Sequence, residues 1–465
     1  MSNIHESTRA SRASIVLLLL LLGIGAIGAV LPARGPVVAG GPISAGDTAW
    51  MLTATALVLF MTPGLSFFYG GMVREKNVIS TMLQSFVAMG LVTVLWIVVG
   101  FSLAFGDSLG GVIGNPRTFF MFAHVGGATD PTLSATVPLA LFALFQLKFA
   151  IITPALITGS FAERVRFSSY MLFICLFTLF IYAPIAHWTW HPQGFLHRWG
   201  VLDFAGGTVV HMSAGFAALA GAMVLGRRKA HIAGEPHVPA NIPFVLLGTG
   251  MLWFGWFGFN AGSALGANAT AALAFLTTNT ASAAAMLAWM LFDGIQGRKP
   301  SALGACIGAV VGLVAITPAA GYVSVGASLL IGAVAAVVCN AAVYWKSRST
   351  LDDTLDVFPC HGVGGMVGMV ATGIFAANVG LIAGETSTFL HHLAALVIVG
   401  AFSFGGSYAL LKLTDLIIPL RVTPDQELEG LDLSQHGESF HASGCVEETT
   451  PLVTEAPDWQ SLKVG

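Results

Sequence analysis

Two histidines lie in stretches of the sequence that are otherwise apolar enough for hydrocarbon. His211 lies within DFAGGTVVHMSAG, and His361 lies within DVFPCHGVGG. An ionisable side chain inside a membrane segment is costly, so it indicates a functional site by default. An imidazole can donate and accept a hydrogen bond, and its charge changes near physiological pH. The two residues are therefore candidates for handling a proton inside a membrane.

Each histidine follows an aspartate near the start of its predicted helix. Asp203 precedes His211 by roughly 12 Å of helix, and Asp356 lies five residues before His361. The alternative for either histidine alone is a buried side chain that is hydrogen-bonded to a carbonyl. The repetition of the pattern in two separate helices favours one shared site, with Asp356 supporting His361.

Aromatic and hydroxyl side chains lie in other apolar stretches. FQLKF contains Phe145 and Phe149, GWFGFNAGSA contains Phe259 and Ser263, and HWTWHP contains Trp190. Residues four apart on a helix share a face, which groups each of the first two pairs. The alternatives are an aromatic belt at the membrane surface for Trp190 and simple packing for the phenylalanines. Together they predict a funnel, with the hydroxyl and the indole at the mouth, the rings beneath and the histidines below.

The elements that must position these residues are membrane helices. The chain is 55% hydrophobic and only 9% charged, whereas soluble domains carry about 25% charged residues. Since about 20 residues cross a bilayer as a helix, we expect an all-α polytopic membrane protein with about eleven spans. The apolar runs are 51–70, 81–105, 133–157, 170–190, 207–225, 242–262, 269–293, 302–320, 323–345, 361–383 and 393–418.

Basic residues indicate the orientation of these spans. They fall mainly in alternate loops, at Arg74 and Lys76, Arg164 and Arg166, Arg227 to Lys229, Arg298 and Lys299, Lys346 and Arg348, and Arg421. The positive-inside rule makes these loops cytoplasmic. With eleven spans, this places the mature N-terminus outside and the C-terminus inside.

The two histidine-bearing spans, the fifth and the tenth, then run in opposite directions. This arrangement predicts two five-helix halves of inverted topology, whose interface holds the substrate path near the midplane. We expect the halves at about 46–228 and 240–385 within a membrane domain at 46–418. A final helix at 389–418 and a cytoplasmic tail at 419–465 complete the chain.

The N-terminal segment 1–39 resembles a secretory signal peptide followed by a short extension. Arg9 and Arg12 precede an apolar block, and cleavage is expected after Ala29, Ala33 or Ala39. The rival interpretation is an uncleaved twelfth helix.

Several classes of function have no support in the sequence. The five cysteines are scattered and show no metal-binding spacing, so we expect no metal, cofactor or disulfide framework. Nothing points to a nucleic acid partner or an enzyme, since no phosphate-binding loop, HExxH motif or nucleophile elbow is present.

Six segments resemble the ammonium transporter (Amt/Mep/Rh) family, bacterial Amt type, in family order over about 46–440. They are FYGGMVREKNVIS, FAERVRFSS, DFAGGTVVHMSAG, GWFGFNAGSA, DVFPCHGVGG and EGLDLSQHGE. The resemblance implies an inner-membrane homotrimer with one pore per subunit, which conducts ammonium or ammonia. It also implies that the tail couples to a PII-type regulatory protein.

The resemblance also implies roles for individual residues. Phe149 and Phe259 resemble the stacked phenylalanine gate, and His211 and His361 resemble the twin histidines. The outer recruitment site is implied to comprise Trp190, Ser263 and Phe145, with Asp203 as the acidic residue near the mouth.

Two alternatives and two departures accompany the resemblance. An ammonium sensor or an Rh-type channel for neutral gases would use the same scaffold. Trp190 and Ser263, as an outer site for a cation, favour transport over a gas channel. Lys148 between the third-span phenylalanines is an unexpected charge, which we expect to flank the pore. The tail has Ser439 and Phe440 where the family suggests a small residue and a tyrosine.

Overall fold

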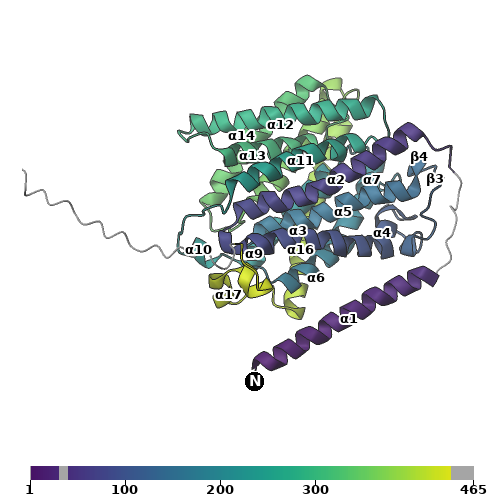
Figure 1. Cartoon of the computed structure of the whole chain (residues 1–465). Coiled ribbons are helices and arrows are strands. Elements are labelled where there is room, and N and C mark those ends of the chain that lie inside the picture. Colours follow the sequence, from purple (N-terminus) through teal and green to yellow (C-terminus); the bar gives the residue numbers. More distant parts are fainter. Residues whose placement is uncertain (1, 31–39, 441–465) are drawn as a thin grey trace, which may run out of the picture.

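The structure is a computed structural model that describes residues 2–30 and 40–440 of the chain, and it is almost entirely helical (Figure 1). The candidate cleavage positions Ala33 and Ala39 lie outside the described residues. The first helix, α1 (Ser2–Val30), runs beside the bundle instead of within it (Figure 1).

The first half of the bundle contains five spans, three of which include a wide π-helical turn. Their elements are α2 (Ala45–Met72), α3 (Val78–Leu95) with η2 (Trp96–Gly100) and α4 (Phe101–Phe105), α5 (Leu139–Phe161), α6 (Phe167–Phe177) with η4 (Thr178–Tyr182) and α7 (Ala183–Trp190), and η5 (Gly207–Met212) with α9 (Ser213–Leu225).

The second half repeats this plan and is followed by one long helix. Its elements are α11 (Ile242–Gly262), α12 (Ala269–Ile295), α13 (Ala302–Ile316), α14 (Val325–Ser347), η6 (Phe358–Val363) with α15 (Gly364–Phe375), and then α16 (Thr386–Ile417). Within the described residues ten helices are long and apolar enough to cross a membrane, and α13 is a shorter apolar helix. The predicted architecture of about eleven spans is confirmed.

Short elements close the ends of the bundle. The strands form two antiparallel hairpins, β1 (Ser108–Leu109) with β2 (Ile113–Gly114), and β3 (Thr129–Asp130) with β4 (Ser134–Pro138). The remaining helical turns are η1 (Glu75–Asn77), η3 (Phe120–Phe122), α8 (Phe195–Arg198), α10 (Lys229–Ile232), η7 (Leu381–Ala383), α17 (Pro424–Glu429) and η8 (Asp432–His436).

Glycines allow the two histidine-bearing segments to cross at very short range. A Cβ atom added at Gly215 would lie 2.2 Å from the amide nitrogen of Gly362, so the two backbones are in direct contact there. Gly365 likewise packs against the Cβ atom of His211, at 3.2 Å from the position that its own Cβ would take. Small residues permit such close packing of membrane helices. The crossing therefore places the two histidines in the centre of the bundle.

Candidate functional site

The structure brings His211 and His361 together. Their Nδ1 atoms lie 3.3 Å apart, and their ring centroids are separated by 5.4 Å. Both side chains are buried, and each lies on a π-helical turn, a feature that is frequent at functional sites. A hydrogen bond between two Nδ1 atoms needs one protonated and one bare nitrogen. Either ring can therefore be the donor, and for two neutral rings an exchange of these roles requires both rings to change tautomer.

An aspartate fixes the start of the segment that carries His211. The Asp203 carboxylate accepts hydrogen bonds from the backbone amides of Gly206, Gly207 and Thr208, at 2.6–2.7 Å, and from the Thr208 hydroxyl. Amides at a helix start lack partners within the helix, so a carboxylate there stabilises the turn. Asp203 is buried and does not line the cavity above the histidines. The structure thus places Asp203 as the cap of η5, outside the lining of that cavity.

In the second half the cap is Asp353 and not Asp356. The Asp353 carboxylate accepts hydrogen bonds from the amides of Val357 and Phe358. Asp356 has a left-handed backbone, with φ of +57°, and its carboxylate pairs with Lys346 at 2.6 Å. The expectation that Asp356 supports His361 is therefore corrected. The reason is that the chain turns at Asp356, so the amides of η6 face the earlier aspartate.

Two stacked phenylalanines lie next to the histidine pair. The rings of Phe149 on α5 and Phe259 on α11 have centroids 4.2 Å apart and planes tilted by 33°. Both side chains are fully buried, and the Phe259 centroid lies 6.1 Å from that of His211. The rings therefore separate the histidine pair from the space above them.

Trp256 also contacts the histidine pair, a contact that was not predicted from the sequence. Its ring stacks on His211 with a centroid distance of 5.4 Å and a tilt of 20°. The Trp256 Nε1 group donates a hydrogen bond to the Thr317 hydroxyl, which fixes the indole. Its position one helical turn before Phe259 was the signal that could have identified it.

The space below the phenylalanine rings is narrow and apolar. A cavity of about 10 Å³ touches both histidines, Trp256 and Phe259. The rest of its lining is aliphatic or aromatic, namely Met61, Leu65, Phe68, Ile152, Leu156, Val210, Leu252 and Val310. A cavity needs roughly 10–15 Å³ of such space for a single water molecule. A hydrated ion cannot fit in this cavity.

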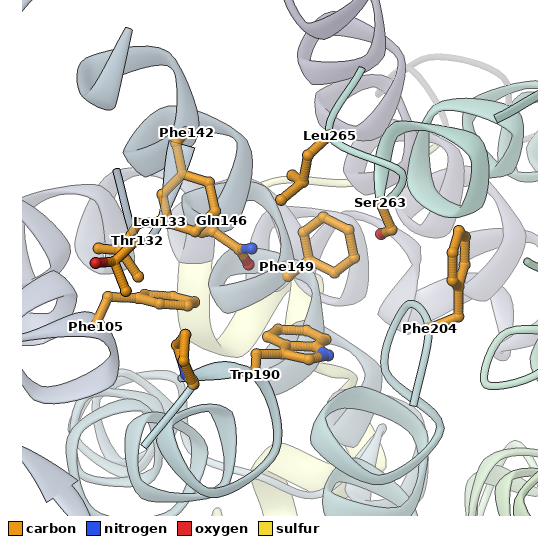
Figure 2. Close-up of a pocket in the computed structure, with 11 residues that line it drawn as sticks. Phe105, Thr132, Leu133, Phe142, Gln146, Phe149, Trp190, Phe204, Ser263 and Leu265 are labelled. Atoms are coloured by element: carbon orange, nitrogen blue, oxygen red, sulfur yellow. The ribbon is translucent and has the colours of Figure 1, made fainter. Parts of the chain in front are cut away.

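A larger cavity of about 150 Å³ lies on the other side of the rings, and we call it the outer cavity. Figure 2 shows its lining: Phe105, Thr132, Leu133, Phe142, Gln146, Phe149, Trp190, Pro192, Phe204, Ser263 and Leu265. The Ser263 hydroxyl donates to the Phe259 carbonyl at 2.8 Å, so its oxygen lone pairs remain available to a cation. Trp190 Nε1 donates to the Asp203 carbonyl, which fixes the indole at the wall.

Phe145 and Gln146 are neighbours on α5, but only Gln146 lines the outer cavity. Phe145 does not line it, because its ring packs against the edge of Phe149 at 5.0 Å and is buried. Gln146 does line it, and its buried Oε1 atom has no hydrogen-bond partner among the described residues. Gln146 was missed because an amide in an apolar helix has no distinctive spacing.

Lys148 lies on α5 with a side chain that is only 8% exposed. It lines neither the outer cavity nor the small cavity at the histidines. Its ammonium group has no hydrogen-bond or ion-pair partner among the described residues. This placement agrees with the expectation that the lysine flanks the pore.

A buried ion network joins the two halves at the end of the bundle that lies away from the outer cavity. Arg228 binds Asp352 at 2.9 Å and Glu163 at 2.7 Å, and all three side chains are at most 8% exposed. Burial alone would raise the pKa of Asp352, but hydrogen bonds from Arg228 and the charges of Arg164 and Arg228 hold it well below its usual range. The network therefore holds Asp352 as a carboxylate.

The tail docks on the same end of the bundle. The Glu427 carboxylate pairs with Arg421 at 2.7 Å and accepts a hydrogen bond from the Lys229 amide. The Asp432 carboxylate accepts hydrogen bonds from the amides of Ile79 and Ser80 at the start of α3. The tail thus caps a membrane helix directly.

Known proteins are similar to this chain in sequence and in fold. The model of the Ammonium Transporter Family matches residues 49–440. The ammonium transporter of Aquifex aeolicus is 47% identical over 406 residues, which cover 86% of this chain and 94% of that protein. The crystal structure of Saccharomyces cerevisiae Mep2 superposes with a TM-score of 0.78 at 36% identity, over 82% of this chain and 88% of Mep2. A protein described as a sensor Amt protein superposes with the same TM-score at 29% identity, over 84% of this chain and 98% of that one.

Proposed function

The chain belongs to the ammonium transporter family, and on that premise we propose that it recruits the ammonium ion at the outer cavity and conducts ammonia past the histidines. Trp190 and Ser263 would hold the ion above the Phe149–Phe259 gate. The contact between His211 and His361 beneath that gate is the observation that carries the proposal.

The energetics favour passage of the neutral form. A cation over an aromatic face gains about 2 kcal/mol when desolvated, whereas moving a small ion into low dielectric costs on the order of 20 kcal/mol in the idealised case. Aromatic rings can therefore recruit ammonium but cannot carry it through the narrow cavity at the histidines. Ammonia avoids most of this cost after losing a proton. Potassium has no proton to lose, so the path would reject it.

The histidines would receive and relay a proton, on the same path or on a separate one. Each imidazole can donate and accept a hydrogen bond. A proton accepted at Nε2 of one ring would be relayed when that ring passes its Nδ1 proton to the other ring, which then releases its own Nε2 proton. His211 Nε2 is buried without a hydrogen-bond partner among the described residues, so it is available to a passing ammonia molecule.

We further propose the cellular arrangement that the family resemblance implies. The protein would be an inner-membrane homotrimer with one pore per subunit, an external N-terminus after signal cleavage and a cytoplasmic tail. A PII-type protein would bind the face that carries Arg74, Lys229 and the tail. The docking of Asp432 on α3 supports a regulatory role for that tail.

Flux through the purified full-length protein tests the transport function. We expect lipid vesicles that contain it to take up ammonium and to carry no potassium current above that of protein-free vesicles. Equal ammonium uptake with and without protein would contradict transport and would favour the sensor alternative, for which a sensor Amt protein is a structural neighbour. Flux of carbon dioxide together with unprotonated ammonia, without dependence on Trp190, would favour the gas-channel alternative.

A further inference from the structure

Leu265 has a backbone conformation that leucine rarely adopts. Its φ is +54°, just after the end of α11, and its amide donates to the Gly262 carbonyl at 2.9 Å. Glycine and asparagine accept this left-handed region more readily than other residues. Strained residues persist where the surrounding structure holds them, and they cluster at ligand sites. The conformation therefore raises the question of what the leucine side chain does.

The side chain of Leu265 forms part of the wall of the outer cavity. Figure 2 shows it reaching toward the ring of Phe149, close to Ser263. A glycine at this position would satisfy the backbone without strain but would leave that part of the wall open. The strained backbone therefore places a bulky side chain in the wall of the outer cavity.

Asp47, at the start of α2, holds the turn that carries Leu265. Its Oδ1 atom accepts a hydrogen bond from the Ala267 amide at 2.9 Å. The same carboxylate is hydrogen-bonded by the Thr136 side chain on β4. The loop between β3 and β4 carries Leu133, which lines the outer cavity. One carboxylate therefore ties together the two segments that supply Leu265 and Leu133.

We propose that Leu265 limits the size of the cation that the outer cavity admits, and that Asp47 is a positioning residue for this limit. The inference rests on the proposed transport of ammonium. Each methyl group added to ammonium replaces an N–H donor with a bulkier group. The cavity of about 150 Å³ has Leu265 beside the gate, where that bulk would have to fit. Leu265 thus favours the parent ion over methylammonium and dimethylammonium.

The test compares uptake of the three cations by vesicles that contain the full-length protein. Leu265→Ala and Leu265→Gly remove the bulk, and we expect the uptake of dimethylammonium relative to ammonium to rise by about tenfold, the lower range for one methylene in an apolar pocket. Leu265→Asn keeps a similar side-chain size and tolerates the left-handed backbone. We expect its uptake ratio to stay close to that of the wild type.

Two further variants control for the backbone and for the anchor. Asn378 also has a positive φ, +64°, and lies outside the outer cavity, so Asn378→Gly relaxes a left-handed residue elsewhere and should leave the ratio unchanged. Asp47→Ala releases the turn and should raise the ratio in the same direction as Leu265→Ala.

The outcomes separate this inference from the proposed function. Ammonium uptake by the alanine and glycine variants with an unchanged uptake ratio would overturn the size limit alone. An equal rise in Leu265→Asn would overturn it as well, because backbone strain and not bulk would then set the ratio. Absence of ammonium uptake by the wild type would instead refute the proposed transport.

Discussion

Asp203 and Asp353 occupy equivalent places in the two halves of the chain. Each lies eight residues before one of the two contacting histidines, and each accepts hydrogen bonds from the first amides of the π-helical turn that carries that histidine. A carboxylate at a helix start also interacts favourably with the helix dipole. The two aspartates therefore set the depth at which His211 and His361 enter the bundle.

The first prediction compares the two capping aspartates with Asp356. Asp203→Ala and Asp353→Ala each leave buried amides without partners, so we expect each to lower the free energy of unfolding by about 1–3 kcal/mol and to reduce ammonium uptake. Asp356→Ala removes no hydrogen bond to an amide of η6, so its uptake should stay near the wild-type level. Thermal unfolding in detergent and vesicle uptake measure both effects. A larger loss of uptake in Asp356→Ala than in Asp353→Ala would contradict the capping assignment.

The second prediction concerns the proton-handling role of the histidines. His211→Ala removes one partner of the Nδ1 contact and opens space in the narrow cavity. We expect the ammonium-driven current to disappear or to lose its selectivity over potassium, while the protein remains folded and assembled. Bilayer recording with either cation as the only charge carrier measures this. Wild-type rate and selectivity in the variant would exclude proton handling by His211.

The third prediction concerns the pH dependence of the buried ion network. The pKa of Asp352 is held below its ordinary value of 3.8, so its contribution to stability is full above that pH and declines as the pH falls through the lower pKa of the folded state. Asp352→Asn leaves Arg228 buried with one partner fewer, which costs about 3–5 kcal/mol near neutral pH. We expect the difference in unfolding temperature between wild type and variant to narrow as the pH falls below 3.8. A difference that is constant across this range would argue against an ionised Asp352.

The sequence predicts the parts of the site that follow from helix periodicity and membrane composition. The spacing of apolar runs indicates the spans, and the aspartate that precedes each histidine distinguishes His211 and His361 from the buried His187 and His392 of other spans. Periodicity and composition do not predict which backbone amides a given carboxylate binds. Asp203 was expected at the substrate site, yet its carboxylate is directed to backbone amides, and only the positive φ of Asp356 shows why Asp353 takes the capping position.

The sequence pattern also does not predict which residues line a cavity through packing across helices. Trp256 and Gln146 each face the path because of how α11 and α5 rotate against their neighbours. Phe145 is turned behind Phe149 for the same reason. A rotation of one residue along a helix, about 100°, decides whether a side chain lines a cavity or packs beside it.

The fourth prediction concerns the docked tail. Deletion from Glu427 onward removes the partner of Arg421 and leaves the Ile79 and Ser80 amides without Asp432. We expect this truncation to lower ammonium uptake and to abolish control by a PII-type protein. A shorter truncation after Phe440 keeps Glu427 and Asp432 with their contacts and serves as the matched control. The deletion from Glu427 would be measured in cells that contain the PII-type protein. Unaltered uptake and regulation in that variant would refute a regulatory role of the tail.

The last prediction concerns Lys148, a charge that lies inside the membrane domain away from both cavities. A lysine ammonium aimed into the outer cavity would repel the substrate cation, so its absence from the lining agrees with recruitment by Trp190 and Ser263. Burial of an unpaired charge is costly, and methionine keeps the length and flexibility of the side chain without that charge. Lys148→Met should therefore preserve ammonium affinity and selectivity and raise the free energy of unfolding by about 1–3 kcal/mol. Lys412→Met is the control, because Lys412 is exposed on α16, and its loss should change stability little. Tighter ammonium binding or a new potassium leak in Lys148→Met would show that this lysine lines the path.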